Sequence, residues 1–207
     1  MPPASLLTFF IQGAALGLSA AASPGPFQTY LISESLSGGW RRGAPLAFAP
    51  LITDLPIILF SLFILNQMPP YFLRIISLAG GLFVFYLAWG LWRSWRQSAG
   101  MEEFEPARPG SSLPRGVIVN FLSPGPYLYW GLITGPILLS ALKQSALDAA
   151  SFLVGFYGIF ILCLLGLAYL FSQARRLGPR VVRALLLVSI LILVVFGGLL
   201  IWKAFTG

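Results

Sequence analysis

Long apolar segments alternate with short polar ones along the whole chain. An α-helix needs ~20 apolar residues to cross the ~30 Å hydrocarbon core of a bilayer. Segments of sufficient length occur at roughly 5–37, 43–65, 71–93, 115–141, 147–172 and 182–205. The first is too long for one straight crossing, because ~33 residues at ~1.5 Å each would extend ~50 Å. The pattern therefore predicts an all-α integral membrane protein with six transmembrane helices, of which the first tilts, bends or projects.

The composition agrees with a membrane location. Of 207 residues, 57% are hydrophobic and 9% are charged, whereas a soluble domain has about 25% charged residues. The net charge of +7 does not indicate nucleic-acid binding, because the basic residues lie between the apolar segments, as topology determinants do. The chain has no histidine and a single cysteine, Cys163, so an internal disulfide and a histidine-based proton relay or metal site are excluded. We expect no metal and no cofactor.

The positions of the basic residues predict how the helices are oriented. One set of loops contains Arg41, Arg42, Arg93, Arg96, Arg108, Arg115, Arg175, Arg176, Arg180 and Arg183. The other set contains only Arg74, Lys143 and Lys203. Loops rich in Lys and Arg stay in the cytoplasm, so we expect both termini outside. Residues 96–114 are rich in Pro, Gly, Ser and charge, which predicts a cytoplasmic linker between three-helix units at 1–95 and 115–207.

The same helix-breaking tetrapeptide occurs in both three-helix units. Its two copies are Ser23-Pro24-Gly25-Pro26 and Ser123-Pro124-Gly125-Pro126. Each copy lies in the first span of its unit, and an odd number of spans makes the second unit enter from the opposite side of the membrane. Secondary transporters are commonly built from such inverted repeats, with interrupted helices at the substrate site. We therefore expect broken helices in spans one and four, although proline and glycine are also frequent in membrane helices in general.

A serine followed by proline is typical of a helix start, with the serine as N-cap and the proline in the first helical position. Each copy therefore predicts a half-helix whose positive dipole end lies inside the membrane. Upstream, the prolines leave four carbonyl groups without their usual donors: those of Ala20, Ala22, Asn120 and Leu122. An anion-binding helix start beside cation-binding carbonyls suits a free amino acid, which carries both charges.

Asp54 is the only acid predicted near the middle of the membrane. Counted from the segment ends, Pro26, Pro124 and Asp54 lie ~18, ~13 and ~17 Å from the cytoplasmic face. A charge at such a depth costs ~3 kcal/mol on insertion scales, and burial favours the neutral carboxyl. Asp54 is therefore either a protonated or internally paired structural acid, or a proton carrier and ligand for an ammonium group of the substrate.

Other residues near the breaks have two interpretations each. Gln28 either lines the substrate site or packs against another span, and Asn120 either caps the freed carbonyls or touches substrate. The aromatic residues that follow the second copy are either cavity walls or packing residues: Tyr127, Tyr129 and Trp130.

Three features further from the breaks have simpler interpretations. Glu34 is expected to form an interfacial ion pair with Arg41 or Arg42. Asp148 is expected at a solvated helix end. The GxxxG pattern at 13–17 allows close helix contact, either within the chain or in a homodimer.

These motifs resemble those of the LysE-type family of amino-acid exporters over essentially the whole chain. The resemblance rests on Pro24-Gly25-Pro26, on the GGWRRG segment at 38–43, on Asp54 in the second span, and on Asn120 followed by Pro124. The family usually has a basic residue after that proline, where this chain has Gly125. If the basic residue binds a carboxylate, the departure predicts a different or neutral solute. The resemblance implies export of amino acids or related metabolites across a bacterial inner membrane, driven by the proton gradient.

The sequence thus predicts a secondary transporter, not an enzyme, for an amino acid or related small zwitterionic metabolite. Asp54 is the proton-coupling candidate. The predicted substrate-binding residues are Ser23, Pro24, Gly25, Pro26, Gln28, Asp54, Asn120, Ser123, Pro124, Gly125, Pro126 and Tyr127. A divalent-cation exporter and a non-transporting membrane partner protein are alternatives. The first is disfavoured, because hard cations need several oxygen ligands and softer ones need His or Cys.

Overall fold

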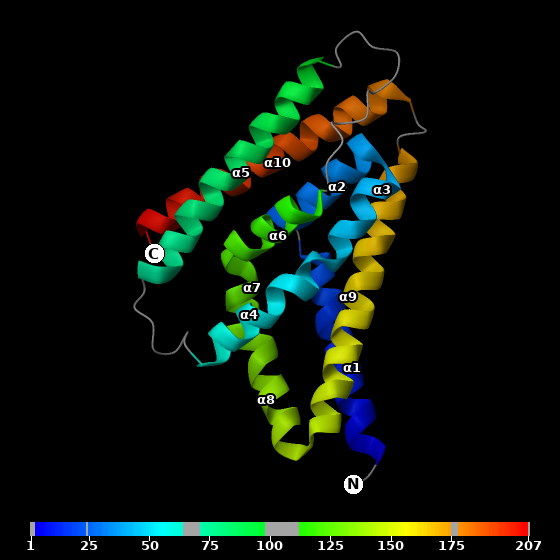
Figure 1. Cartoon of the computed structure of the whole chain (residues 1–207), viewed down its shortest axis with the longest axis vertical. Helices are drawn as coiled ribbons and strands as arrows, with labels where there is room; N and C mark the ends of the chain where they lie inside the picture. Colours follow the sequence, from blue (N-terminus) through cyan, green and yellow to red (C-terminus); the bar gives the residue numbers. More distant parts are fainter. Residues whose placement is uncertain (1–2, 24, 64–70, 98–111, 175–177, 207) are drawn as a thin grey trace.

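The fold comes from a computed structural model that describes residues 3–23, 25–63, 71–97, 112–174 and 178–206. Pro24 and most of the predicted linker at 96–114 lie outside these ranges. Every described element is a helix (Figure 1). The elements are α1 (Pro3–Ala22), α2 (Pro26–Gly38), α3 (Trp40–Gly43), the 3-10 helix η1 (Ala44–Phe48), α4 (Ala49–Phe63), α5 (Tyr71–Gln97), α6 (Leu113–Leu122), α7 (Pro124–Tyr129), the π-helix η2 (Trp130–Thr134), α8 (Gly135–Gln144), α9 (Ala146–Ala174) and α10 (Pro179–Thr206).

Each of the six apolar segments of the sequence coincides with helical structure. Single helices, α5, α9 and α10, occupy the third, fifth and sixth segments, whereas the first, second and fourth contain shorter helices in series. Among the described residues, three stretches are long and apolar enough to cross a membrane: Trp40–Phe60, Ala146–Ala174 and Arg180–Trp202. Leu6–Ala22 and Pro26–Gly38, bent by 67° at their break, add a fourth if they form one span. These apolar helices identify a membrane protein.

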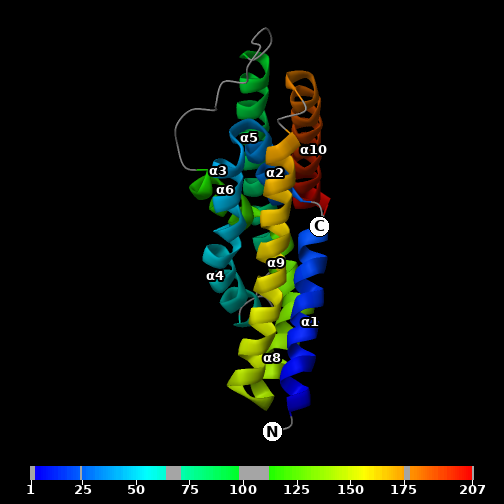
Figure 2. The same cartoon turned by 90° about the vertical axis from the view of Figure 1, so that its right-hand side faces the viewer.

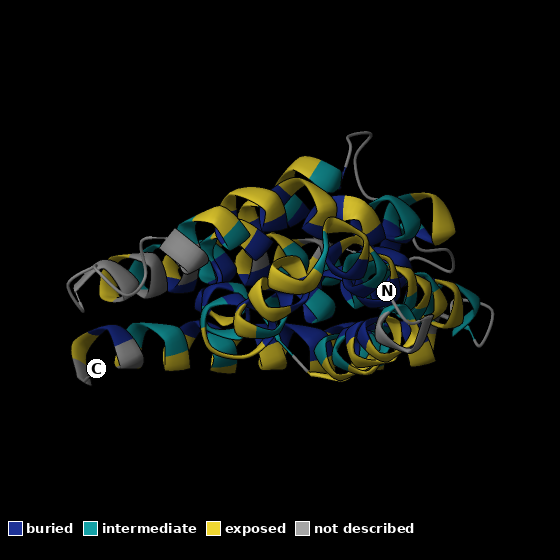
Figure 3. Ribbon diagram, turned by 90° about the horizontal axis from the view of Figure 1, so that it is seen from below, coloured by how far each residue is buried: buried dark blue, intermediate teal, exposed yellow. Residues whose placement is uncertain are grey.

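The outward faces of the helices carry large apolar side chains. In Figure 3 the exposed residues lie along the outer faces of the helices and the buried ones turn inward. Leu132, Leu162 and Leu191 are among the exposed leucines. An apolar surface of this extent is unfavourable in water, whereas lipid tails cover it at no cost in a bilayer.

Two long helices, α1 and α9, pack closely along their length (Figures 1 and 2). Gly13 and Gly17 of α1 face the α9 backbone, where an added Cβ would overlap the carbonyl oxygens of Phe152 and Phe156. Gly155 of α9 lies equally close to the α1 backbone. Small residues allow such an approach in membranes, where packing contacts stabilise helix pairs. The GxxxG pattern is therefore used inside the chain.

A second long pair consists of α5 and α10, which lie beside each other in both views (Figures 1 and 2). Glycines also bring these helices together, since a Cβ on Gly197 would lie 3.2 Å from the Gly81 carbonyl oxygen. Helix α2 contacts both α9 and α10, and α4 contacts α6, α7 and η2. The short helices thus fill the space between the two long pairs.

Both SPGP serines close the helix that precedes them. Each hydroxyl donates to the carbonyl four residues back, from Ser23 to Ser19 (2.8 Å) and from Ser123 to Val119 (2.7 Å). Each serine N–H donates to the carbonyl three residues back, at Ala20 (3.3 Å) and Asn120 (3.2 Å). The two copies therefore make the same pair of hydrogen bonds.

The expected N-cap position is confirmed for Ser123 and is wrong for Ser23. Gly25 occupies the N-cap of α2, and Pro26 is its first residue. Ser123 does occupy the N-cap of α7, but its hydroxyl makes no capping hydrogen bond there. The reason is that Pro24 and Pro124 donate nothing to the Ala20 and Asn120 carbonyls, which accept the serine N–H instead. The serine hydroxyl then replaces that N–H at the carbonyl four residues back, so these backbone acceptors stay paired.

Candidate functional site

A cavity of about 360 Å³ lies where the two SPGP copies face α4 and α9. Its lining residues are Ala20, Ser23, Gly25, Pro26, Phe27, Gln28, Pro50, Asp54, Asn120, Ser123, Pro124, Gly125, Pro126, Leu128, Tyr129, Trp130, Phe156, Phe160, Phe196 and Leu200. They come from both predicted three-helix units. All the predicted substrate-binding residues are among them except Pro24, which lies outside the described residues, and Tyr127.

Asp54 is held at the cavity wall by Tyr157 and Asn120, which lie in the second half of the chain. Its side chain is only 3% exposed. Tyr157 Oη donates to Asp54 Oδ2 at 3.1 Å. Asn120 Nδ2 donates to Thr53 Oγ1 at 2.6 Å and reaches Asp54 Oδ1 at 3.4 Å. These partners are neutral donors, so they orient the carboxyl group without neutralising its charge.

The amide of Asn120 therefore holds Thr53 and Asp54, and it does not cap the freed carbonyls. The other amide, Gln28, lies across the first break and donates from Nε2 to the Ala20 carbonyl at 3.2 Å. That carbonyl is one of those predicted to lose its donor. Gln28 thus both lines the cavity and ties α2 to the end of α1.

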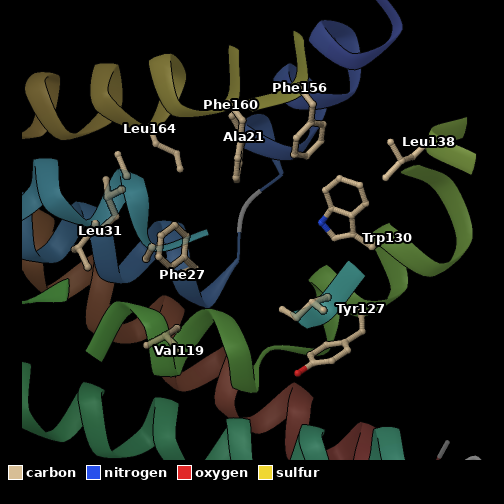
Figure 4. Packing of buried hydrophobic residues seen from close by; sticks show 14 of the residues in the cluster. Ala21, Phe27, Leu31, Val119, Tyr127, Trp130, Leu138, Phe156, Phe160 and Leu164 are labelled. Atoms are coloured by element: carbon tan, nitrogen blue, oxygen red, sulfur yellow. The ribbon is translucent and has the colours of Figure 1, made fainter. Parts of the chain in front are cut away.

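Aromatic rings form one wall of the cavity. Trp130 and Phe156 face each other with centroids 5.1 Å apart, and Phe160 continues the row at 5.6 Å from Phe156 (Figure 4). Tyr129 also lines the cavity, and its hydroxyl donates to the Leu16 carbonyl at 2.8 Å. Of the three aromatic candidates, Tyr129 and Trp130 are therefore wall residues.

Tyr127, the third aromatic candidate, faces away from the cavity. Its hydroxyl points away from Trp130 (Figure 4) and donates to the Phe121 carbonyl at 2.9 Å. Its ring packs edge-on against Phe60, with centroids 5.7 Å apart. In this position Tyr127 supports the end of α6.

Two further acids pair locally. Arg42 Nε lies 2.9 Å from Glu34 Oε2, which confirms the expected ion pair, although both side chains are largely buried.

Asp148 is 1% exposed, so its expected solvated position is wrong. It forms a capping box at the start of α9: Ser145 Oγ donates to Asp148 Oδ2 at 2.7 Å, and Asp148 N–H donates to Ser145 Oγ at 3.0 Å. The serine three residues upstream was the overlooked signal.

Sequence reasoning missed Thr53 and Tyr157 as partners of Asp54, and Phe156 and Phe160 as cavity walls. Tyr157 has a polar hydroxyl within an apolar helix, which is a usable signal for a buried hydrogen bond. The two phenylalanines carry no such signal, because aromatic residues are common throughout this chain.

The chemistry of the cavity is that of a binding site with one acid and apolar walls. Among the described residues, no group of three or more His, Cys, Asp or Glu is arranged to hold a metal ion. The side chains fit an organic solute with a cationic group better than a hard cation, which needs several oxygen ligands.

Comparison with known proteins identifies the family. A family model described as LysE type translocator matches residues 18–204, a range that includes both SPGP copies and all the cavity-lining residues. Neither the curated proteins nor the solved structures searched gave a match. On the strength of the family match, the chain belongs to the LysE type translocator family.

Proposed function

We propose that the protein is a secondary transporter that exports an amino acid, or a related small metabolite with an ammonium group, across the bacterial inner membrane. Membership of the family implies a membrane exporter of such compounds. The observation that carries the proposal is the single cavity lined by both SPGP copies and by Asp54. Carrier sites formed by equivalent helix breaks are typical of secondary transporters with inverted repeats.

We further propose six spans in two inverted units, residues 1–95 and 115–207, with both termini outside. The six helical segments support this arrangement. The matching hydrogen bonds of Ser23 and Ser123 also support it, because related breaks in two halves are expected to share local geometry.

Proton coupling is proposed to occur at Asp54. A carboxylate in an apolar site binds either a proton or an ammonium group, and both ligands compete for the same charge. Proton entry from outside therefore releases the solute there, and solute binding from the cytoplasm releases the proton. Asn120 and Tyr157 are neutral, so they hold the carboxyl in place in both states.

The broad test compares the metabolites that accumulate in cells with and without the protein. A parallel test measures resistance to toxic amino-acid analogues and to metal salts. Protection from analogues supports the proposed export, whereas protection from metal salts alone would contradict it. That second result would favour a divalent-cation exporter, for which the cavity offers only Asp54 as an acid.

The sharper test is Asp54→Asn in reconstituted vesicles. Asparagine has the same shape but binds no proton and carries no charge, so we expect a folded protein that has lost proton-driven efflux. Asp148→Asn is the matched control, since Asp148 is equally buried but caps α9 outside the cavity. Unchanged proton-driven efflux by Asp54→Asn would remove this residue from the mechanism.

A further inference from the structure

The hydroxyl groups that line the cavity have no hydrogen left for a ligand. Each donates to a backbone carbonyl of the protein: Ser23 to Ser19 at 2.8 Å, Ser123 to Val119 at 2.7 Å, and Tyr129 to Leu16 at 2.8 Å. A hydroxyl has one hydrogen but two lone pairs. These three groups therefore face a ligand as acceptors.

The two amide side chains of the cavity also offer a ligand mainly hydrogen-bond acceptors. Asn120 uses its Nδ2 group on Thr53 and Asp54, at 2.6 and 3.4 Å. Gln28 uses one hydrogen of Nε2 on Ala20, at 3.2 Å. Within the described part of the chain, neither amide oxygen accepts a hydrogen bond, so both oxygens stay open to a ligand.

The charge of the cavity has one sign. Asp54 is the only charged side chain among the lining residues, which include no Lys or Arg. An ammonium group gains the attraction of Asp54 and the lone pairs of the hydroxyls and amides. A carboxylate meets like charge at Asp54. The donors that line the cavity are one N–H of Gln28, the indole N–H of Trp130 and backbone N–H groups at the starts of α2 and α7, and none of them belongs to a cationic side chain. Burial of an anion without a cationic partner is unfavourable.

The aromatic wall of the cavity favours a solute whose uncharged part is apolar. Trp130, Phe156, Phe160 and Tyr129 present aromatic surface to the cavity, and aromatic faces attract both apolar groups and cations. A volume of about 360 Å³ is at the small end of ligand pockets, which suits a solute with a single ring.

We propose that the solute is a singly charged ammonium ion with an apolar, preferably aromatic body, whose carboxyl group is absent or masked as an amide. This inference rests on the proposed function and narrows it. An amine or an amino-acid amide meets these requirements, whereas a free zwitterion places its carboxylate in a cavity whose lining holds Asp54 and no Lys or Arg.

The test compares three probes that share a phenyl ring and a two-carbon chain. They differ in the groups on that chain, which are an ammonium, an ammonium with a carboxylate, and a carboxylate alone. These are 2-phenylethylamine, L-phenylalanine and 3-phenylpropionate, titrated at pH 7 into the purified full-length protein by calorimetry. We expect the amine to bind about tenfold more tightly than phenylalanine or better, and the acid not to bind, because a poorly paired buried carboxylate costs at least that factor. Phenylalanine binding as tightly as the amine would overturn the inference.

A charge-reversal variant gives an independent result. A Cβ at Gly125 would meet no atom within 4 Å, so Gly125→Lys has room to place an ammonium group at the cavity. We expect this variant to weaken amine binding and to strengthen phenylalanine binding. Gly125→Met, with a chain of similar length and no charge, fills the same space, so we expect it to weaken binding of all the probes without shifting the preference toward phenylalanine. The same order in both variants would contradict the assigned role of cavity charge.

Transport by the reconstituted protein separates this inference from the proposed function. Binding of the amine in the expected order without efflux of any probe would refute export and leave the ligand class standing. Efflux of phenylalanine in preference to the amine would refute the ligand class and leave export standing.

Discussion

The substitution Gly13→Ala tests the close contact between α1 and α9. An added Cβ would overlap the Phe152 carbonyl oxygen and lie 3.0 Å from the Phe156 backbone nitrogen. Both are backbone atoms, so no side-chain rotation relieves the overlap. Restoring ordinary contact requires the helices to separate by roughly 1 Å. Overpacking of this kind costs about 1–3 kcal/mol.

A matched control isolates this packing cost. Gly158 lies within α9, and a Cβ there would meet no atom within 4 Å. Replacing glycine by alanine inside a helix gains about 0.8–1 kcal/mol in helix propensity, and this gain is common to both positions. The difference in stability between Gly13→Ala and Gly158→Ala therefore equals the packing cost, about 1–3 kcal/mol.

The assay is thermal unfolding in detergent. After heating to each temperature, size-exclusion chromatography with fluorescence detection measures the fraction of protein that is still folded. For a chain of this size, each kcal/mol shifts the midpoint by roughly 2–4 °C. We expect Gly158→Ala to unfold at or above the wild-type temperature and Gly13→Ala to unfold below it. If Gly13→Ala is as stable as Gly158→Ala, the close contact between α1 and α9 is refuted.

The remaining predictions concern buried polar groups. Asn120→Leu leaves Thr53 and Asp54 without their shared amide donor, so we expect a loss of about 1–3 kcal/mol in unfolding free energy and reduced efflux; wild-type stability would show that the amide is dispensable. Glu34→Gln removes the acid of the largely buried ion pair with Arg42 and should cost about 3–5 kcal/mol. Adding Arg42→Gln should recover part of that loss in the same unfolding assay, and additive losses would contradict a coupled ion pair.

The helical segments were predictable from the sequence, because apolar length alone determines where a chain can form membrane-crossing helices. All six predicted segments are helical in the structure. The ends were less predictable: α5 continues to Gln97, past the apolar boundary at 93, and α10 begins at Pro179, before the boundary at 182, because a helix does not have to end where its apolar stretch ends.

The site was predictable where a residue is unusual for its surroundings. Asp54 and the repeated SPGP stand out in apolar sequence, and both line the cavity. The hydrogen bonds of Tyr157 and Thr53 depend on which helices pack against α4. That packing is a tertiary contact, which spacing along the chain does not encode. The N-cap position was predictable for Ser123 but not for Ser23, and the hydroxyl bonds to Ser19 and Val119 were not predicted, because the rule for helix starts does not consider the end of the preceding helix.

The paired serine hydrogen bonds give each broken helix a mechanical property. Because the end of α1 and the end of α6 are closed by their own serines, a change of angle between the segments breaks no backbone hydrogen bond at that end. Each segment can then change direction as a rigid helix, with Gly25 between α1 and α2 and Ser123 between α6 and α7. Replacing either serine by alanine removes its hydroxyl hydrogen bond and should therefore weaken the end of the preceding helix, so that a change of angle there would no longer leave the helix end intact.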